Sequence, residues 1–430
     1  MKRIIFALSF IQAMWLCIYP VTLSGQEFMP NYDESKVPEY TLPDPLVSSD
    51  GARVTDAATW FGKRRPEILQ LFTEQVYGKA PGPSEDVRYS TIDSSKSLDG
   101  LATRKQVSLT FRQGQKELSV TLLLYIPNNR PHPVPAFLGL NFSGNHSINK
   151  DPGIRLNTNW MRPNKAKGIV NNRATEASRG NAASRWPIKM VLQRGYAVAT
   201  AYYGDIDPDY DDGFHNGAHS LFNQPGNSTP AQDEWGSIGA WAWGLSRIMD
   251  YLETDGAIDH QRIIVMGHSR LGKTSLWAGA QDERFAMVIS NNSGCGGAAL
   301  SSRRYGETVG VINSSFPHWF CKNFKQYNDK ENLLPVDQHM LLSLIAPRPL
   351  YVASAEKDRW ADPKGEYLAL KHADPVYRLV GTDGLVDRMP VVNQSLIGTL
   401  SYHIRSGEHS VTSYDWEQYL KWADRFLMDQ

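Results

Sequence analysis

Cysteine is scarce in this sequence: the 430 residues include only three. One of them, Cys17, lies in an N-terminal segment that we expect to be removed, so the mature chain keeps Cys295 and Cys321 and can form one disulfide at most. An oxidising compartment would permit a bridge between these two residues. Two free, buried thiols are an equally good interpretation, because the sequence gives no distance between them.

An excess of one charge is also absent. The 45 Lys and Arg residues balance 45 Asp and Glu residues, and the basic residues form no stripe. Since the sequence has no nucleic-acid motif either, we expect no nucleic-acid partner. The composition, 41% hydrophobic and 21% charged without a biased or repetitive tract, is typical of a globular protein.

Long hydrophobic runs are missing except at the start of the chain. A short basic start is followed by an apolar run, residues 4–23, and then by small residues up to Gly25. This pattern predicts a signal peptide over residues 1–25, and hence a secreted or periplasmic protein without a membrane attachment after cleavage. An uncleaved membrane anchor is the less favoured alternative, because polar residues and Pro20 interrupt a run that is short for a bilayer span.

The segment after the expected cleavage site, residues 26–60, is rich in Pro, Asp and Ser and is predicted to be an arm that is ordered on the surface. An apolar periodicity then predicts a helix over residues 64–77. Two alternating segments, 106–111 and 118–126, are typical of a half-exposed antiparallel pair of strands.

Further along the chain, short apolar strands alternate with helical segments. The strands are predicted at residues 136–141, 196–201, 262–267, 286–290, 350–354 and 400–404. The helices are predicted at residues 183–194, 238–252, 270–280, 340–345, 364–371 and 414–428. This alternation predicts an α/β fold of three layers, in which a mostly parallel sheet is covered on both faces and the antiparallel pair forms one edge. Because no linker or internal repeat is visible, residues 26–430 are interpreted as a single domain.

Residues 267–273 read Gly-His-Ser-Arg-Leu-Gly-Lys, directly after an apolar strand and at the start of a predicted helix. A sharp turn from strand to helix lifts a serine hydroxyl clear of the sheet, and the helix N-terminus favours developing negative charge. Ser269 is therefore the predicted nucleophile. The common motif is G-x-S-x-G, whereas the second glycine here comes one residue later, at Gly272. The alternative is that Ser269 only caps an ordinary helix.

A series of further motifs follows this turn. After G-H-S-R-L-G-K come S-G-C-G-G-A-A-L, H-W-F, L-P-V-D-Q-H, A-P-R-P, D-R-W-A-D-P and R-S-G-E-H, which together span residues 267–409. The combination resembles the bacterial branch of the glucuronoyl esterases, carbohydrate esterase family 15. The resemblance implies an α/β-hydrolase fold and hydrolysis of esters of (4-O-methyl-)glucuronic acid, such as those that link glucuronoxylan to lignin. We expect no cofactor.

A serine nucleophile needs a base, and the base needs an acceptor that holds its tautomer. In this fold the chain order is serine, then acid, then histidine. His409 lies in the loop after the last predicted strand, where the fold has its base, and is the predicted base. His339 and His403 are less suitable, since they fall at a helix start and inside a strand.

Two positions compete for the acid. The loop after the strand at 350–354 holds Glu356, Asp358 and Asp362, and the resemblance points to Asp358. Many glucuronoyl esterases instead carry a glutamate after the preceding strand, within S-G-E-G-G, and Cys295 stands there in this sequence. A thiol cannot hold an imidazolium as a carboxylate does, so either Asp358 is the sole acid or the protein is catalytically impaired.

The remaining site residues come mainly from the resemblance. The backbone amide of Arg270 is the first expected oxyanion donor, and in the family the matching arginine side chain also reaches the oxyanion. A second oxyanion segment is expected at residues 140–146. The resemblance implies that Lys273, Glu307 and Trp360 contact the uronate. Without it, a surface lysine, a salt-bridged glutamate and a core tryptophan are the simpler interpretations.

Residues 205–213 are acidic and invite comparison with a calcium-binding loop. Tyr210 stands where an EF-hand loop needs glycine, so we predict no metal and a solvated loop near the rim of the cleft. We expect a monomer that acts on a glucuronoxylan or lignin–carbohydrate ester. Two alternatives stay open: another carbohydrate esterase of the same fold that removes acetyl or feruloyl groups, and a sugar-binding homologue that has lost catalysis.

Overall fold

The computed structural model describes residues 28–131, 133–223, 230–385 and 388–428, so the predicted signal peptide, residues 1–25, lies outside the described residues. Within them, ten strands form one sheet in the order β1-β2-β3-β7-β4-β8-β9-β10-β12-β11, and β5 and β6 pair separately. The strands are β1 (Asp86–Ser97), β2 (Ala102–Gln113), β3 (Lys116–Pro127), β4 (Val134–Asn141), β5 (Ile169–Val170), β6 (Arg173–Ala174), β7 (Ala197–Tyr202), β8 (Ile258–His268), β9 (Met287–Asn291), β10 (Leu350–Ala355), β11 (Gln394–Leu396) and β12 (Leu400–Arg405).

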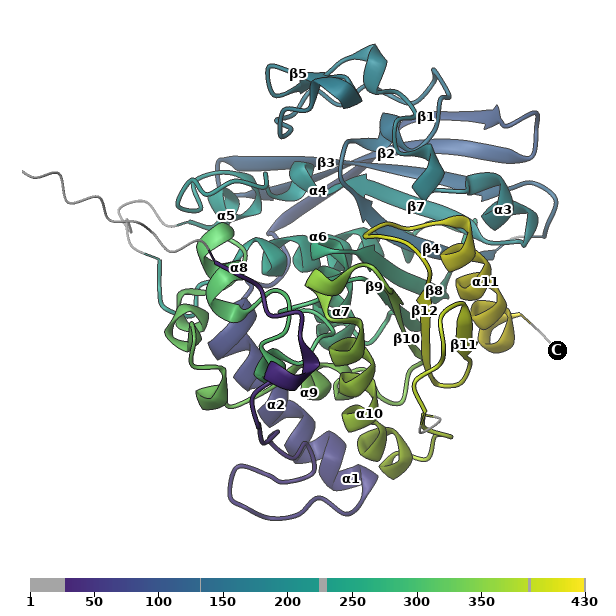
Figure 1. Cartoon of the computed structure of the whole chain (residues 1–430). Coiled ribbons are helices and arrows are strands. Elements are labelled where there is room, and N and C mark those ends of the chain that lie inside the picture. The colour runs from purple at the N-terminus through teal and green to yellow at the C-terminus, as the bar shows by residue number, and fades with distance from the viewer. Residues whose placement is uncertain (1–27, 132, 224–229, 386–387, 429–430) are drawn as a thin grey trace, which may run out of the picture.

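The large sheet is parallel in its centre and antiparallel at its edges. β4 pairs in parallel with β7 and β8, and the parallel run continues through β9 and β10 to β12. The short β11 runs antiparallel to β12 at one edge. The other edge consists of the long antiparallel strands β1, β2 and β3 (Figure 1). The mostly parallel sheet with an antiparallel edge is therefore confirmed.

The antiparallel edge differs from the prediction in two ways. The sequence does not predict β1, because every residue of this strand is exposed or partly exposed and its side chains show no apolar alternation. Backbone pairing with β2 defines it instead. The prediction that both other strands are half exposed is wrong for β3, since its last six residues are buried. Three short helices, α3, α4 and α5, pack against that strand and cover it.

The α-helices of the described residues include counterparts of all seven predicted helices and four short helices that were not predicted. They are α1 (Ala57–Thr59), α2 (Arg65–Phe72), α3 (Ile188–Gln193), α4 (Tyr203–Ile206), α5 (Gly217–Phe222), α6 (Ser237–Leu252), α7 (Arg270–Gln281), α8 (Val309–Ser315), α9 (Gln338–Ser343), α10 (Pro363–Leu379) and α11 (Ser413–Leu427). Two π-helical turns join and extend α1 and α2 into one helical segment that begins before the predicted 64–77. The predicted helix 183–194 is broken at Pro187, because proline lacks the amide that a helix interior needs.

Successive residues of the central strands point to opposite faces of the sheet, and each face has its own core. In β8, Ile263 and Val265 belong to one buried cluster, whereas Ile264 and Met266 belong to the other. Helices α6, α7, α9 and α10 cover the first face, and α3 and α11 cover the second (Figure 1). The three-layer α/β architecture of the prediction is thereby confirmed.

Residues 28–56 run over the surface before α1. Leu46 and Val54 are buried and attach this segment to the core. Glu34 forms ion pairs with Arg303 and Lys364, both at 2.7 Å, which bring the segment beside the loops at the carboxyl ends of the parallel strands. Among the described residues, no helix combines the length and apolar character that crossing a bilayer requires.

Candidate active site

Ser269 stands at the sharp turn between β8 and α7. Its backbone has φ 58° and ψ −129°, a conformation that costs a non-glycine residue about 1–3 kcal/mol. The Ser269 amide donates to the carbonyl of Asn291 at 2.9 Å, and the Ser269 carbonyl accepts from the amides of Gly272 and Lys273 at 2.8 and 3.2 Å. These main-chain bonds stabilise the strained turn and leave the serine on the wall of a cavity.

The two glycines of the turn have different neighbours. A Cβ atom on Gly267 would lie 1.8 Å from the carbonyl oxygen of Leu271, so no other residue fits there. A Cβ atom on Gly272 would lie 3.0 Å from Cβ of Ser293, in the loop that follows β9. The close approach of α7 to that loop therefore favours glycine at position 272.

His409 and Asp358 follow the neighbouring parallel strands β12 and β10, so they reach the same edge of the sheet. Nδ1 of His409 donates a hydrogen bond to Oδ2 of Asp358 at 2.5 Å. Because a carboxylate only accepts, this bond leaves Nε2 as the ring atom that can take up a proton. The Asp358 side chain is covered, with 4% exposed, whereas 42% of the His409 side chain is exposed. Both residues line the same cavity as Ser269.

The loop after β9 supports Asp358 and contains the cysteine that stands at the glutamate position of the resemblance. Asn292 Nδ2 donates to Oδ2 of Asp358 at 2.7 Å. Cys295 and Cys321 are both buried and free, so the described residues hold no bridge between them. Burial, reinforced by the charge of Glu307, raises the pKa of the Cys295 thiol well above its usual range. The thiol is neutral and cannot replace a carboxylate.

Glu366, on α10, forms hydrogen bonds with the backbone of the same loop. The sequence motifs did not indicate this role. Its Oε1 accepts from the amides of Ser293 and Gly294 at 2.8 and 3.0 Å, and its Oε2 accepts from the Ser354 hydroxyl at 2.5 Å. Burial raises the pKa of Glu366 to about 8. This carboxyl group therefore keeps its proton near neutral pH.

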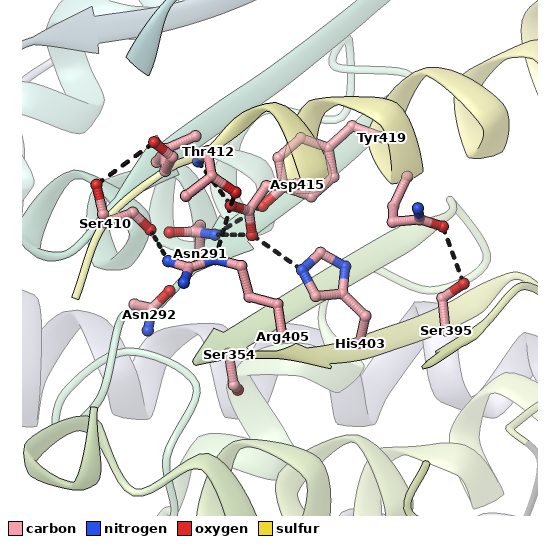
Figure 2. A network of polar contacts seen from close by, with 12 residues as sticks. Asn291, Asn292, Ser354, Ser395, His403, Arg405, Ser410, Thr412, Asp415 and Tyr419 are labelled. Atoms are coloured by element: carbon pink, nitrogen blue, oxygen red, sulfur yellow. Dashed lines mark hydrogen bonds and ion pairs between the residues drawn. The ribbon is translucent and has the colours of Figure 1, made fainter. Parts of the chain in front are cut away.

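A buried ion pair holds the loop that carries His409. Arg405, the last residue of β12, donates to the carbonyls of Ser406, Glu408 and Ser410 at 2.9, 3.0 and 2.5 Å, on both sides of His409. Asp415, at the start of α11, accepts from Nε of Arg405 at 2.8 Å (Figure 2). The loop conformation thus depends on side chains outside the loop.

Asp415 is the centre of a wider buried network. Its carboxylate also accepts from His403 at 2.9 Å, from the Thr412 amide at 2.7 Å and from Asn291 Nδ2 at 3.1 Å (Figure 2). The sequence interpretation set His403 aside as a strand residue, and it lies inside β12 as expected. Its role is structural, because the ring is fully buried against Asp415.

The same network reaches the residue before the nucleophile. Asn291 Oδ1 accepts from Nδ1 of His268 at 2.7 Å, and the His268 ring packs against the His409 ring with 4.4 Å between centroids. Burial, with a further contribution from the charge of His409, lowers the pKa of His268 well below its usual value. His268 is therefore a neutral platform for the candidate base, a role that its position in the motif did not suggest.

Arg270 is held by a carboxylate from the acidic segment. Its Nη1 forms an ion pair with Asp209, and its guanidinium lies 4.6 Å from the centre of the Trp319 ring. Burial alone would raise the pKa of Asp209. The hydrogen bond from His318 and the charge of Arg270 outweigh burial and lower this pKa. Nε of Arg270 is buried and has no hydrogen-bond partner among the described residues, so it can still donate.

The prediction that residues 205–213 form a solvated loop is wrong for the three aspartates at its start. Asp205, Asp207 and Asp209 are buried. Asp207 accepts from His219 at 2.9 Å, and Asp209 accepts from His318 at 2.9 Å. The carboxylates of Asp207 and Asp209 each accept from a buried histidine, and this pairing offsets the free-energy cost of burying them. The described residues contain no group of three or more His, Cys, Asp or Glu that could hold a metal ion.

Lys273, Glu307 and Trp360 share one cavity of about 340 Å³ with Ser269 and His409, which we call the Lys273 cavity. Lys273 is buried rather than on the surface; its Nζ donates to the Ser293 carbonyl and lies 3.9 Å from Oε2 of Glu307. Burial lowers the pKa of Lys273 and raises that of Glu307, and the charge of each opposes the shift of the other. Trp360 is not a core residue, since 38% of it is exposed at the rim.

The second expected oxyanion segment, residues 140–146, follows β4. Two of its residues, Phe142 and Ser143, line a second cavity on the other side of Ser269. The structure thus brings every predicted site residue to one edge of the sheet. The supporting roles of Glu366, Arg405, Asp415 and His268 were missed: Glu366 and Asp415 lie outside the motifs, and the motifs that contain His268 and Arg405 do not show what these side chains contact.

Comparisons with known proteins point to one family. A family model described as "Glucuronyl esterase, fungi" matches residues 197–381. The carbohydrate esterase MZ0003, from an unknown prokaryotic organism, is 52% identical over 398 residues, which are 92% of this chain and 92% of that protein. The chain belongs to carbohydrate esterase family 15.

Solved structures of family members agree with the fold. A promiscuous esterase of the family from a marine bacterial metagenome superposes with a TM-score of 0.87 at 52% identity, covering 93% of this chain and all of the other. The glucuronoyl esterase from Solibacter usitatus gives a TM-score of 0.86 at 48% identity, covering 91% of this chain and 99% of the other. The α/β-hydrolase fold is thereby confirmed, and membership of the family makes the chain a carboxylic ester hydrolase.

Proposed function

We propose that this family 15 esterase hydrolyses esters of (4-O-methyl-)glucuronic acid, as in lignin–glucuronoxylan linkages, through Ser269, His409 and Asp358. The observation that carries the proposal is the Lys273 cavity itself. It combines Ser269 and the hydrogen-bonded pair of His409 and Asp358 with a buried lysine and glutamate, which are costly to bury unless a polar ligand uses them.

The proposed acyl transfer follows from the atoms that remain free. His409 Nε2 takes the proton of the Ser269 hydroxyl while Oγ attacks the ester carbonyl, and Asp358 holds Nδ1–H and stabilises the imidazolium. The developing oxyanion is stabilised by the backbone amide of Arg270 and by its unpaired Nε. His409 then gives the proton to the leaving alcohol, and water repeats the sequence to release the acid.

The uronate is proposed to bind in the Lys273 cavity. Lys273 and Glu307 lie close enough to share hydroxyl groups of one sugar ring, because Nζ and Oε2 are 3.9 Å apart. Trp360 offers a ring face at the rim, a common platform for sugars. Together with the signal peptide predicted at the N-terminus, this substrate suits a secreted or periplasmic enzyme.

Hydrolysis of benzyl glucuronate tests the proposal. We expect saturable release of benzyl alcohol by the wild-type protein and none above background in Ser269→Ala. Replacing the buried cation in Lys273→Met should raise KM for the glucuronate roughly tenfold or more, since a charged hydrogen bond to the sugar is lost. A folded wild-type protein that leaves benzyl glucuronate intact would refute the proposal.

A second candidate is a broader ester specificity, favoured by the 52% identical relative described as promiscuous. On this reading the enzyme also removes small acyl groups such as acetyl, or feruloyl groups. Nitrophenyl acetate and methyl ferulate, used as substrates, distinguish this broader specificity from one restricted to glucuronate esters. A kcat/KM for either that equals or exceeds that for benzyl glucuronate would favour the broader activity.

A further inference from the structure

Ser269 lies between two cavities, not at the end of one. Besides the Lys273 cavity, a cavity of about 290 Å³ opens on the other side of the nucleophile, and Ser269, Arg270 and His409 line both. We call it the Arg185 cavity. Its far wall belongs to the long connection between β4 and α3, which contributes residues 161–164, Lys167, Ile169 and Arg185.

The two cavities differ in charge. Glu307 and Asp358 line the Lys273 cavity, whereas no acidic residue among the described residues lines the Arg185 cavity. Arg162, Lys167 and Arg185 line the latter instead. The Arg185 cavity therefore has a positive electrostatic potential, because its charges are uncompensated at its own wall.

Two of the three cations of the Arg185 cavity, Arg185 and Lys167, have side chains without a hydrogen-bond or ion-pair partner among the described residues. The guanidinium of Arg185 is half buried and makes no hydrogen bond or ion pair with the described residues, and burial lowers its pKa. Lys167 is exposed and makes no ion pair with them either. Arg162 lies 3.7 Å from the carboxylate of Asp209, which Arg270 already occupies. A half-buried arginine without a carboxylate is unfavourable in the free protein, and an anionic ligand would supply the missing partner.

Apolar side chains complete the wall. Phe142, Met161 and Ile169 line the Arg185 cavity beside the three cations. A ligand that fits both features has a flat apolar part and a negative charge at its far end. An aromatic ring with an anionic substituent has this form.

We propose that the Arg185 cavity binds the alcohol part of the ester, and that the preferred alcohol is aromatic and carries a carboxylate or sulfate group. This inference rests on the proposed function. The ester carbonyl must lie at Ser269, which both cavities share, so a uronate in the Lys273 cavity directs the alcohol to the Arg185 cavity. The segment between β4 and α3 then determines which leaving group is accepted, while the Lys273 cavity determines the acyl group.

Three glucuronate esters that share a benzyl leaving group and differ in its para substituent test the charge preference. They are benzyl, 4-carboxybenzyl and 4-(aminomethyl)benzyl glucuronate, and a 4-(sulfooxy)benzyl ester separates sulfate from carboxylate recognition. We expect kcat/KM for the carboxybenzyl ester to exceed that for the benzyl ester roughly tenfold, and the aminomethyl ester to be the poorest. Half-molar salt should reduce these differences.

The variants assign the preference to named residues. Arg185→Gln combined with Lys167→Gln should bring the ratio of kcat/KM for the carboxybenzyl and benzyl esters close to one. Since the Arg185 guanidinium makes no hydrogen bond or ion pair with the part of the chain that the structure describes, its replacement removes none there. Lys165→Gln is the matched control: this lysine is also exposed but does not line the cavity, so the ratio should stay at the wild-type value. A wild-type ratio of one, or a ratio unchanged in the double variant, would overturn the inference.

A binding measurement separates this inference from the proposed function. In Ser269→Ala, 4-(hydroxymethyl)benzoate should bind roughly tenfold more tightly than benzyl alcohol by NMR titration, and the difference should disappear on replacement of Arg185 and Lys167. If benzyl glucuronate is not hydrolysed but this difference is found, the proposed function fails and the anion site stands. Equal binding of the two alcohols would overturn the anion site even in an active glucuronoyl esterase.

Discussion

The turn that carries Ser269 and the loop that carries His409 lie at the same edge of the sheet but are held in different ways. Main-chain hydrogen bonds fix Ser269, through its own amide and through those of Gly272 and Lys273. The loop of His409 is fixed by a side chain, because Arg405 donates to three of its carbonyls and is itself held by Asp415. The nucleophile is thus positioned by backbone geometry and the base by a buried ion pair.

This difference decides which changes should affect which half of the site. Substitution of a remote side chain can move His409 but has little effect on Ser269, whose contacts survive any change that leaves the backbone intact. Conversely, a change of backbone preference at Ser269 should alter stability without disturbing the base. The following predictions separate these effects.

The largest expected effect is at the nucleophile. Ser269→Ala and Ser269→Gly should both reduce kcat/KM for a glucuronate ester roughly 10⁴-fold or more. They should differ in stability: glycine adopts φ 58° freely, so Ser269→Gly should raise the free energy of unfolding by about 1 kcal/mol over Ser269→Ala. Chemical denaturation of the two variants measures this difference. Equal stabilities would show that the turn holds no backbone strain.

The next largest effect is expected at the acid. Asp358→Asn should lower kcat roughly 10³-fold while the fold persists, because the amide no longer favours the Nδ1–H tautomer of His409 or stabilises the imidazolium. Glu356→Gln is the control, since this acid of the same loop is exposed. Steady-state kinetics of the two variants measure the difference in kcat. If Asp358→Asn keeps more than a tenth of the activity, another group must hold the base.

The same comparison explains what the sequence could predict. Ser269 was predicted because its turn needs adjacent residues: an apolar strand, Gly267 and a helix start, all visible in one window of sequence. His409 was predicted from chain order and loop position, whereas the choice of Asp358 among the acids of its loop needed the resemblance. Arg405 and Asp415 could not be predicted, because nothing in either residue's own neighbourhood shows that they meet.

The other errors of prediction concern residues whose burial differs from what their local sequence suggests. The acidic segment at 205–213 was interpreted as solvated because isolated aspartates prefer water, yet Asp207 has a buried partner 12 residues away and Asp209 has one 109 residues away. β1 was missed for the opposite reason, since it is a strand without a buried face. Local pattern predicts an element well only when its own side chains form the core, as in the parallel strands.

An intermediate effect is expected when the support of the base is removed. Arg405→Met leaves the carboxylate of Asp415 without its cation and should destabilise the protein by about 3 kcal/mol. It should also lower kcat roughly tenfold with little change in KM, because the loop of His409 loses its hydrogen bonds to Arg405 whereas the residues that contact the sugar are unchanged. Arg425→Met is the matched control; its side chain is half exposed and lies 3.8 Å from Asp383, so a loss below about 0.5 kcal/mol is expected.

Urea denaturation and steady-state kinetics on the same preparations test this prediction. If Arg405→Met does not fold, Arg405→Lys provides a second variant that keeps the charge but cannot reach three carbonyls and a carboxylate at once. A destabilised variant with unchanged kcat would show that Arg405 only stabilises the fold and does not position His409.

The smallest expected effect on catalysis concerns Glu366, which supports the loop of Asn292 and thereby Asp358 and should make the stability depend on pH. Burial raises the pKa of Glu366 to about 8, so the folded protein keeps a proton that the unfolded chain releases near the ordinary value of 4.5. Between these values the unfolded state binds fewer protons, and the stability contributed by this group is therefore present at low pH and lost as the pH rises towards 8.

Glu366→Gln imitates the protonated carboxyl at every pH. We expect the melting temperature of the wild type to fall relative to that of Glu366→Gln from pH 5 to pH 8.5, while the exposed Glu417→Gln follows the wild type. The opposite slope would mean that the two amides of Ser293 and Gly294 hold Glu366 as a carboxylate, and that the support of the acid, like that of the base, is an ionic one.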